Sequence, residues 1–191
     1  MSPSFYGERE HLLPPVKMIF KRILLSSLLG LSTAVATSSP TSCVSESTSV
    51  NDFNSKCAAI ASGLSIEHGV VHFSEFVAAG TNLSLTENDP SCTQSFIPVT
   101  ADICRIALTV STSERSGFNM EAWLPSNWTG RFLSVGNGGL NGCIKYEDLA
   151  YTTALGFSAV GTNNGHNGTG GLPFYNNSAV VEDFAYRAYV I

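Results

Sequence analysis

The sequence feature that most limits how this chain can fold is a run of glycines directly after an apolar segment, within RFLSVGNGGLNGC at residues 131–143. Residues 132–135 are typical of a buried strand, and the glycines that follow cannot form the interior of a helix. Because glycine has no Cβ, the backbone can turn sharply there and a ligand atom can approach its N–H groups closely. The sequence therefore predicts a strand that ends in a tight loop with accessible amides.

The segments before this loop alternate apolar and polar residues with the period of a strand. Residues 102–112 place one set of apolar side chains on a single face, namely Cys104, Ile106, Leu108 and Val110. Residues 118–125 alternate in the same way, and residues 66–85 contain short apolar stretches broken by glycines. Residues 102–135 therefore predict antiparallel strands joined by turns.

After the loop the pattern changes to helices and strands in alternation. Residues 146–156 predict a short helix closed by Gly156, residues 157–162 a strand, and residues 178–191 an amphipathic helix. The residues expected on the core side of that last helix are Val181, Phe184, Ala185 and Ala188, and the expected ion pair joins Asp183 and Arg187. Antiparallel strands followed by strand–helix units predict an α/β fold.

The composition excludes several classes of partner. Hydrophobic residues make up 43% and charged residues 13% of the 191 residues, which is typical of one globular domain. The formal net charge of −5 predicts a surface that repels nucleic acid and anionic membranes. We therefore expect no nucleic acid partner and no membrane association once a signal peptide has been removed.

The N-terminal region has the features of a secretory signal peptide. Residues 18–36 carry Lys21 and Arg22 near their start, continue as a short apolar run and end in small residues. A membrane anchor is the alternative, but the run is short and rich in Ser. We interpret residues 1–17 as an upstream extension and residues 37–56, which are rich in Ser and Thr, as a flexible mature N-terminus. The sequence thus predicts a secreted, extracellular protein.

Cysteines and N-glycosylation sequons fit the same compartment. The chain has five cysteines, which are expected in disulfides after secretion, with one left over because the number is odd. Sequons predict glycosylation at Asn82, Asn127, Asn167 and Asn176.

Two histidines offer a metal-binding alternative that the surrounding residues disfavour. His68 and His72 have the i, i+4 spacing of two ligands on one helix face. The segment between them contains Gly69, Val70 and Val71, which favours a strand or a turn. We therefore expect no metal site in this chain.

One chemical role suits the glycine loop. The backbone N–H groups of Asn137, Gly138 and Gly139 would point at the negative oxygen of a tetrahedral intermediate, as the loop after an early central strand does in α/β hydrolases. A simple tight turn is the alternative. A phosphate-binding loop is disfavoured because no Lys-Ser/Thr pair follows, and a dinucleotide-binding GxGxxG pattern fails at Asn141.

Several short motifs occur together from the middle of the chain onward. They are Trp123-Leu124-Pro125, Gly130-Arg131-Phe132, Gly136-Asn137-Gly138-Gly139, Gly165-His166, and Asp183-Phe184 with Arg187. Their combination resembles the fungal tannase and feruloyl esterase family, from about residue 57 to the end. The resemblance implies an α/β-hydrolase fold, secretion, and serine-dependent hydrolysis of carboxylic esters of hydroxycinnamic or gallic acid. It also implies calcium, bound by a lid domain of the full-length relatives and not by this chain.

The same resemblance draws attention to what this sequence lacks. Family members carry their nucleophile in a Gly-Cys-Ser-x-Gly elbow, and no Cys-Ser pair occurs here. Ser134 lies within a strand and His166 lies in a Gly/Asn loop, where we expect a hydrogen bond that stabilises the loop, so neither replaces the triad. We therefore expect residues 57–191 to be the N-terminal part of an esterase domain with an incomplete α/β-hydrolase fold, inactive by itself, with the catalytic residues beyond residue 191. A non-catalytic secreted glycoprotein that acts as a binding module is the alternative.

Disulfide partners are implied by the resemblance as well. It pairs Cys57 with Cys104 and Cys92 with Cys143, and it leaves Cys43 as the odd cysteine. The second disulfide would anchor the segment after the glycine loop and hold its N–H groups in place.

Overall fold

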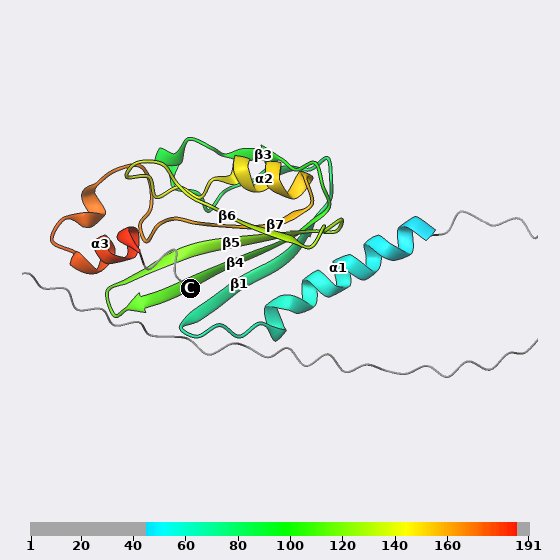
Figure 1. The fold of residues 1–191 in the computed structure, drawn as a ribbon, viewed down its shortest axis with the longest axis horizontal. Coiled ribbons are helices and arrows are strands. Elements are labelled where there is room, and N and C mark those ends of the chain that lie inside the picture. The colour runs from blue at the N-terminus through cyan, green and yellow to red at the C-terminus, as the bar shows by residue number, and fades with distance from the viewer. Residues whose placement is uncertain (1–44, 187–191) are drawn as a thin grey trace, which may run out of the picture. The chain divides into compact units, whose positions relative to one another are not determined.

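A computed structural model describes residues 45–186 of the chain (Figure 1). The predicted extension 1–17, the signal peptide 18–36 and Cys43 lie outside the described residues, as do Arg187 and Ala188. Within the described range, no helix is both long enough and apolar enough to span a membrane.

A five-stranded sheet forms the centre of the fold, in the order β1-β4-β5-β7-β6. Its strands are β1 (Gly69–Val77), β4 (Ile103–Ser113), β5 (Ser116–Pro125), β7 (Phe157–Thr162) and β6 (Arg131–Val135). β1, β4, β5 and β7 pair antiparallel, whereas β6 runs parallel to β7. Antiparallel strands thus lead into a parallel pair joined by a helix, as expected for an α/β fold. The antiparallel arrangement predicted for residues 131–135 is wrong, because within residues 45–186 β6 pairs only with β7 and runs parallel to it.

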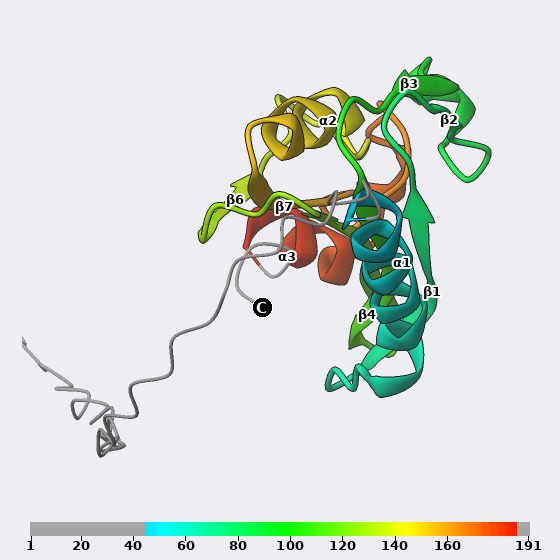
Figure 2. The ribbon, with the colours of Figure 1, turned by 90° about the vertical axis from the view of Figure 1, so that its right-hand side faces the viewer.

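Helices pack on both faces of this sheet. α1 (Ser45–Gly63) packs on β1 and β4, and α2 (Tyr146–Ala154) connects β6 to β7 and packs on β7. Figures 1 and 2 show the two helices on different sides of the sheet. Gly156 follows α2 with a φ of 79°, the left-handed conformation that the sequence predicts at this helix end.

The alternation of strand residues produces one hydrophobic core on each face. On β4, Ile106 packs in a cluster with Cys57 of α1, whereas Ile103 packs in a cluster with Leu149 of α2. The alternation predicted for residues 102–112 is therefore confirmed, but both faces of the strand are buried instead of one.

A second, two-stranded sheet is formed by residues between β1 and β4 in the sequence. It pairs β2 (Asn82–Ser84) with β3 (Phe96–Pro98), and the segment between them contains the short helix η1 (Pro90–Cys92). Leu85 and Ile97 of this region join the α2-side core, so the small sheet extends that core beyond the central strands.

The start of α1 contradicts one prediction. Residues 45–56, interpreted as part of a flexible N-terminus, are helical. Phe53, Cys57 and Ile60 are spaced by four and three residues, and they pack together in the core beneath β4. The Ser/Thr-rich composition of this segment hides the periodic apolar residues of α1, because the surface that they pack against forms only when the sheet folds. The disulfide between Cys57 and Cys104 then joins the helix to β4, with the two Cα atoms 5.5 Å apart.

α3 (Ser178–Ala185) follows the short helix η2 (Leu172–Phe174), and its core-facing side differs from the prediction. The buried residues are Val180 and Asp183, whereas Val181 is 45% exposed. Asp183 faces inward because its Oδ2 accepts a hydrogen bond from Thr112 Oγ1 at 2.7 Å. A polar contact with the β4–β5 hairpin thus decides the orientation of a helix that was expected to follow its apolar residues.

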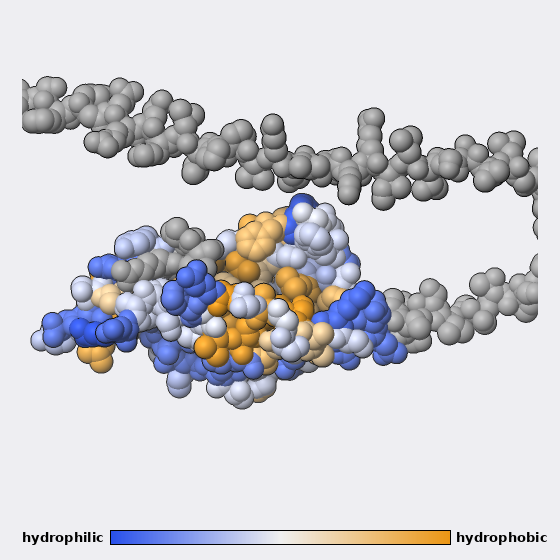
Figure 3. All heavy atoms as spheres, turned by 90° about the horizontal axis from the view of Figure 1, so that it is seen from below, coloured by the Kyte–Doolittle hydropathy of each residue, from blue (hydrophilic) through white to orange (hydrophobic). Residues whose placement is uncertain are grey.

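β6 forms one edge of the sheet within residues 45–186. Its side chains Phe132 and Leu133 are 63% and 38% exposed. Figure 3 shows apolar side chains gathered on the face of the molecule seen from below the view of Figure 1. Open strand edges and exposed apolar surface both favour association with further polypeptide.

Candidate functional site

Two loops leave the sheet at the same edge. Because β6 and β7 are parallel neighbours, the loop 136–143 after β6 and the loop 163–171 after β7 begin side by side. Gly142 N donates a hydrogen bond to Gly168 O at 2.8 Å, which joins the two loops. The glycine run therefore lies where sheets of this class present ligand-binding loops.

The glycine loop leaves its backbone N–H groups open. A Cβ built on Gly136, Gly138 or Gly139 would meet no atom within 4 Å, so open space adjoins each of them. Gly139 has a φ of 60°, which favours glycine. Among the described residues, no acceptor receives a hydrogen bond from the amides of Asn137, Gly138 or Gly139. These are the amides that the sequence predicts for an oxyanion hole.

Asn137 anchors the loop through its side chain. Its Nδ2 donates to Thr162 O, at the end of β7, at 2.9 Å and to Asn141 O at 3.2 Å. Asn164 Nδ2 donates to the same Asn141 carbonyl at 3.1 Å. The asparagine among the glycines thus holds the turn against β7, a function that its position in the sequence did not reveal.

The loops approach each other most closely at Gly142. A Cβ on Gly142 would lie 2.7 Å from Cε1 of His166 and closer still to the His166 carbonyl oxygen, so only glycine fits. The next residue, Cys143, forms a disulfide with Cys92, with the Cα atoms 5.7 Å apart. This is the pairing that the resemblance implies, and it joins the end of the glycine loop to η1.

His166 occupies a different environment from the one expected. Its side chain is 5% exposed, and neither ring nitrogen has a hydrogen-bond partner within the part of the chain that the structure describes. The ring instead packs against Phe174, with the centroids 4.6 Å apart, and against Phe184 at 5.8 Å. Burial lowers the pKa of His166. The imidazole therefore acts mainly as a packed ring. His166 contributes a hydrogen bond to its loop through the backbone, where its N donates to Asn163 O at 3.2 Å.

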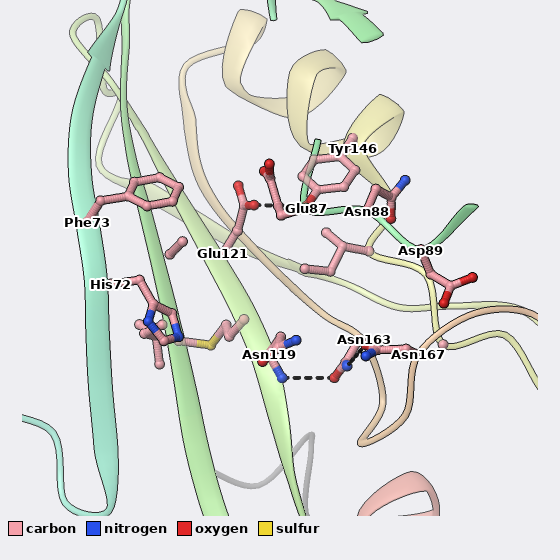
Figure 4. Close-up of a pocket in the computed structure, with 15 residues that line it drawn as sticks. His72, Phe73, Glu87, Asn88, Asp89, Asn119, Glu121, Tyr146, Asn163 and Asn167 are labelled. Carbon is pink, nitrogen blue, oxygen red and sulfur yellow. Dashed lines mark hydrogen bonds between the residues drawn. The ribbon is translucent and has the colours of Figure 1, made fainter. Parts of the chain in front are cut away.

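A buried ion cluster centred on Arg105 lies on the α2 side of the sheet, and the sequence analysis missed it. Figure 4 shows two of its carboxylates, Glu87 and Glu121. Arg105 donates from Nε to Glu121 Oε2 at 2.7 Å and from Nη2 to Glu121 Oε1 at 2.6 Å. The same guanidinium donates to Glu75 Oε1 at 3.1 Å and also pairs with Glu87. The sequence did carry one signal for the pair Arg105 and Glu121. Each is a charged residue at an inward-facing position of a strand, and the two strands are neighbours in the sheet.

Glu121 accepts two more hydrogen bonds from neutral donors. Trp123 Nε1 donates to Oε2 and the Tyr146 hydroxyl donates to Oε1, both at 2.8 Å. Burial raises the pKa of Tyr146, and the nearby Glu121 carboxylate raises that pKa further. The phenol therefore stays protonated and continues to donate its hydrogen bond to the carboxylate.

A cavity with a volume of about 250 Å³ opens beside this cluster. Figure 4 shows Phe73 and Tyr146 on the side of the cluster, and Asn119 and Asn163 toward the loop after β7. Gly142 also lines the cavity, so its wall includes the point where the two loops meet. The arrangement combines aromatic surface, amides and carboxylates next to the candidate oxyanion loop.

The remaining predicted site residues lie apart from this site or on its margin. The sequon asparagines are all exposed, namely Asn82, Asn127, Asn167 and Asn176. His68 precedes β1 with a φ of 58° and His72 lies within β1, so the helical spacing of metal ligands does not apply to them. In residues 45–186, no group of three or more His, Cys, Asp or Glu residues could hold a metal ion. Ser134 is exposed on β6 and has no elbow geometry.

Comparisons with known proteins agree on one family. A family model described as tannase and feruloyl esterase matches residues 104–191. A protein of Aspergillus fumigatus named probable feruloyl esterase B-2 is 54% identical over 136 residues, which make up 71% of this chain and 26% of that protein. The chain thus spans only 26% of the length of that relative.

Two crystal structures from Aspergillus oryzae have similar folds. One is of an esterase, with a TM-score of 0.70 and 53% identity, and the other is of feruloyl esterase B, with a TM-score of 0.69 and 51% identity. Each match covers 71% of this chain and 27% of the solved chain. These likenesses confirm the predicted α/β fold class, of the α/β-hydrolase type.

Proposed function

Because the chain belongs to the tannase and feruloyl esterase family, we propose that it forms the oxyanion-hole region of a secreted serine esterase. The proposed reaction is hydrolysis of a carboxylic ester whose acyl group is an aromatic acid, such as a hydroxycinnamic or gallic acid. The observation that carries the proposal is the loop after β6, whose amides at residues 137–139 have no acceptor within the described range and whose glycines Gly136, Gly138 and Gly139 adjoin open space.

The loop would act on the charge that develops during ester cleavage. Attack on the ester carbonyl turns its oxygen into an oxyanion, and fixed N–H dipoles stabilise that charge without having to reorient. Loss of one such donor costs roughly 3 kcal/mol of transition-state stabilisation. The Asn137 side chain and the Cys92–Cys143 disulfide restrain the loop on both sides, which supports a preorganised role.

The attacking serine is proposed to come from outside the 191 residues. The sequence has no Gly-Cys-Ser-x-Gly elbow, Ser134 lies exposed on a strand edge, and His166 is enclosed by phenylalanine rings. We therefore propose that the chain by itself hydrolyses no ester, and that its loop functions together with a serine, an acid and a base of a longer polypeptide.

Secretion, N-glycosylation and calcium remain proposals that derive from the family and the sequence. The exposure of the sequon asparagines supports glycosylation. Calcium finds no suitable group of ligands among residues 45–186, so no step of the proposed reaction is assigned to it in this chain.

A hybrid enzyme tests this proposal. The segment of the Aspergillus oryzae feruloyl esterase B that matches this chain would be replaced by the corresponding residues of this chain, and hydrolysis of methyl ferulate and methyl gallate would be measured. We expect turnover by the hybrid and none by the 191-residue chain alone. In the hybrid, Gly138→Pro removes one N–H group and should lower kcat by about 100- to 1,000-fold.

Gly138→Ala is the matched control, because it keeps the N–H group and its Cβ meets no atom within 4 Å. It should leave kcat within a few-fold of the parent hybrid. An equal loss of kcat in both variants would contradict the proposal, because it would show that the size of the side chain at residue 138 matters and its N–H group does not. A hybrid that melts cooperatively but hydrolyses neither ester would favour the alternative of a non-catalytic binding module.

A further inference from the structure

We propose that His166 is a positioning residue for the loop 136–143, an inference that rests on the oxyanion role proposed above. Its neutral imidazole, wedged between Gly142 and the rings of Phe174 and Phe184, holds the two loops together. Protonation of this ring releases them.

The imidazole is packed from three directions. Phe174 of η2 and Phe184 of α3 lie 4.6 Å and 5.8 Å from it between centroids, and their own centroids are 5.2 Å apart. Gly142 closes the third side, since a Cβ there would lie 2.7 Å from both Nδ1 and Cε1 of His166. The ring is therefore in direct contact with the backbone of the glycine loop.

Hydrogen bonds between the loops flank this contact. Gly142 N donates to Gly168 O at 2.8 Å, and Asn164 Nδ2 donates to Asn141 O at 3.1 Å. His166 lies between Asn164 and Gly168 in the sequence, so its ring supports the middle of the contact. Displacing the ring would loosen both hydrogen bonds and, through Asn141, the end of the turn that presents the open amides.

The surroundings of the ring suit a neutral imidazole and disfavour a charged one. Neither ring nitrogen of His166 forms a hydrogen bond of ordinary geometry among the described residues. Burial outweighs the backbone of Asn167, which favours the protonated ring, so the pKa of His166 is lowered. Loop 136–143 and η2 carry no titratable side chain apart from the disulfide-bonded Cys143. The charged residues on α3 are Glu182 and Asp183, and Asp183 Oδ2 accepts a hydrogen bond from Thr112 Oγ1. The β4–β5 turn contributes two charges of opposite sign, Glu114 and Arg115, to a cavity that His166 also lines.

The direction of the pH effect follows from these surroundings. Burial lowers the pKa of His166 in the closed loops below its ordinary value of 6.5, so the opened loops take up a proton first as the pH falls. The contact is fully stable above the pKa of the opened state and weakens as the pH drops toward the lowered pKa. At pH 5 the opened state gains at most about thirtyfold over its population at neutral pH.

Hydrogen exchange measured by mass spectrometry on the purified 191-residue chain tests the proposal between pH 7.5 and pH 5. The reporters are the amides of Asn141 and Gly142, which donate to Gly138 O and Gly168 O. After correction for intrinsic exchange rates, their protection should fall by up to about thirtyfold at pH 5, whereas protection of α2 should stay constant.

Variants separate the titration of His166 from its bulk. His166→Phe and His166→Leu keep an apolar side chain without a titratable group, so the protection of Asn141 and Gly142 should no longer depend on pH. His68→Asn is the matched control, because it removes an exposed histidine and tolerates the left-handed φ of 58°. This control should retain the full pH response.

Two results would overturn the proposal. One is pH-independent protection of the loop in the parent chain, which needs no variant to be observed. The other is an unchanged pH response in a folded His166 variant. No ester is involved in these measurements, so an inactive hybrid enzyme would refute the proposed function and leave the positioning role of His166 standing.

Discussion

Glu121 shows at the residue scale how much a buried charge depends on its neighbours. The side chain is 2% exposed in the middle of β5, where a lone carboxylate would be strongly destabilising. Arg105, Trp123 and Tyr146 all donate hydrogen bonds to it, so the charge is both paired and solvated by protein groups. Removing the charge leaves the guanidinium without its most buried partner.

Glu121→Gln should therefore destabilise the chain by about 3 kcal/mol, because breaking one partner of a buried ion pair typically costs this much. Urea denaturation followed by circular dichroism measures the loss. Glu114→Gln, at an exposed position in the β4–β5 turn, is the matched control and should change the free energy of unfolding by less than about 0.5 kcal/mol. Similar losses in both variants would mean that the cluster contributes no specific stabilisation.

Single residues were predictable from the sequence where their chemistry is local. The glycines after a strand and the left-handed Gly156 follow from backbone conformation alone. The side-chain contacts of Asn137, His166 and Glu121 were not predicted, because they depend on partners that the fold brings together, such as the carbonyl of Thr162 for Asn137. The unpaired ring of His166 also contradicts the ordinary expectation that a histidine in a polar loop forms hydrogen bonds.

Among the elements, α1 illustrates how tertiary contacts override composition. Residues 45–56 of the helix were predicted as flexible chain, yet Phe53 packs edge-on against Phe76 with the ring centroids 5.9 Å apart. The strands were easier to predict, because their period of two is visible without knowledge of what covers them. A helix that packs through only a few apolar residues, as α1 does, shows a weaker periodicity in the sequence.

Removing the Cys57–Cys104 disulfide should detach α1 before the sheet is lost. A variant with Cys57→Ala and Cys104→Ala should lose about 4 kcal/mol of stability, the chain-entropy value for a closed loop with a sequence separation of 47. Hydrogen exchange should show loss of protection in α1 while α2 remains protected. Protection of α1 equal to that of the parent chain would show that packing alone holds the helix.

For the molecule as a whole, the sheet divides the interior into two cores and ends in two edge strands among the described residues, β1 and β6, of which β6 exposes large apolar side chains. The α/β class followed from the sequence because the change from antiparallel alternation to strand–helix units is local in the chain, whereas the strand order was not predicted. The side of the sheet that each helix covers did not follow from it, since that depends on contacts such as the hydrogen bond between Thr112 and Asp183.

The β6 edge predicts concentration-dependent self-association of the chain. Phe132→Lys should reduce it, because a charged side chain on an edge strand opposes further strand pairing. Sedimentation velocity over a range of concentrations measures the effect. Tyr151→Lys changes an exposed aromatic residue on α2 in the same way and should leave association unchanged. A parent chain that stays monomeric at every concentration would contradict the prediction.

The bond between Cys92 and Cys143 has a consequence for biogenesis. This disulfide restrains the chain at Cys143, shortly after the amides of residues 137–139, which have no acceptor in the described part of the chain. Thiols are kept reduced in the cytosol, so the disulfide cannot form there. If the chain is secreted, as proposed, a newly made chain would carry a loop without this disulfide until translocation exposes it to oxidants. If the loop serves ester cleavage, competence would be gained only after export, and intracellular esters would be spared while the polypeptide is still being made.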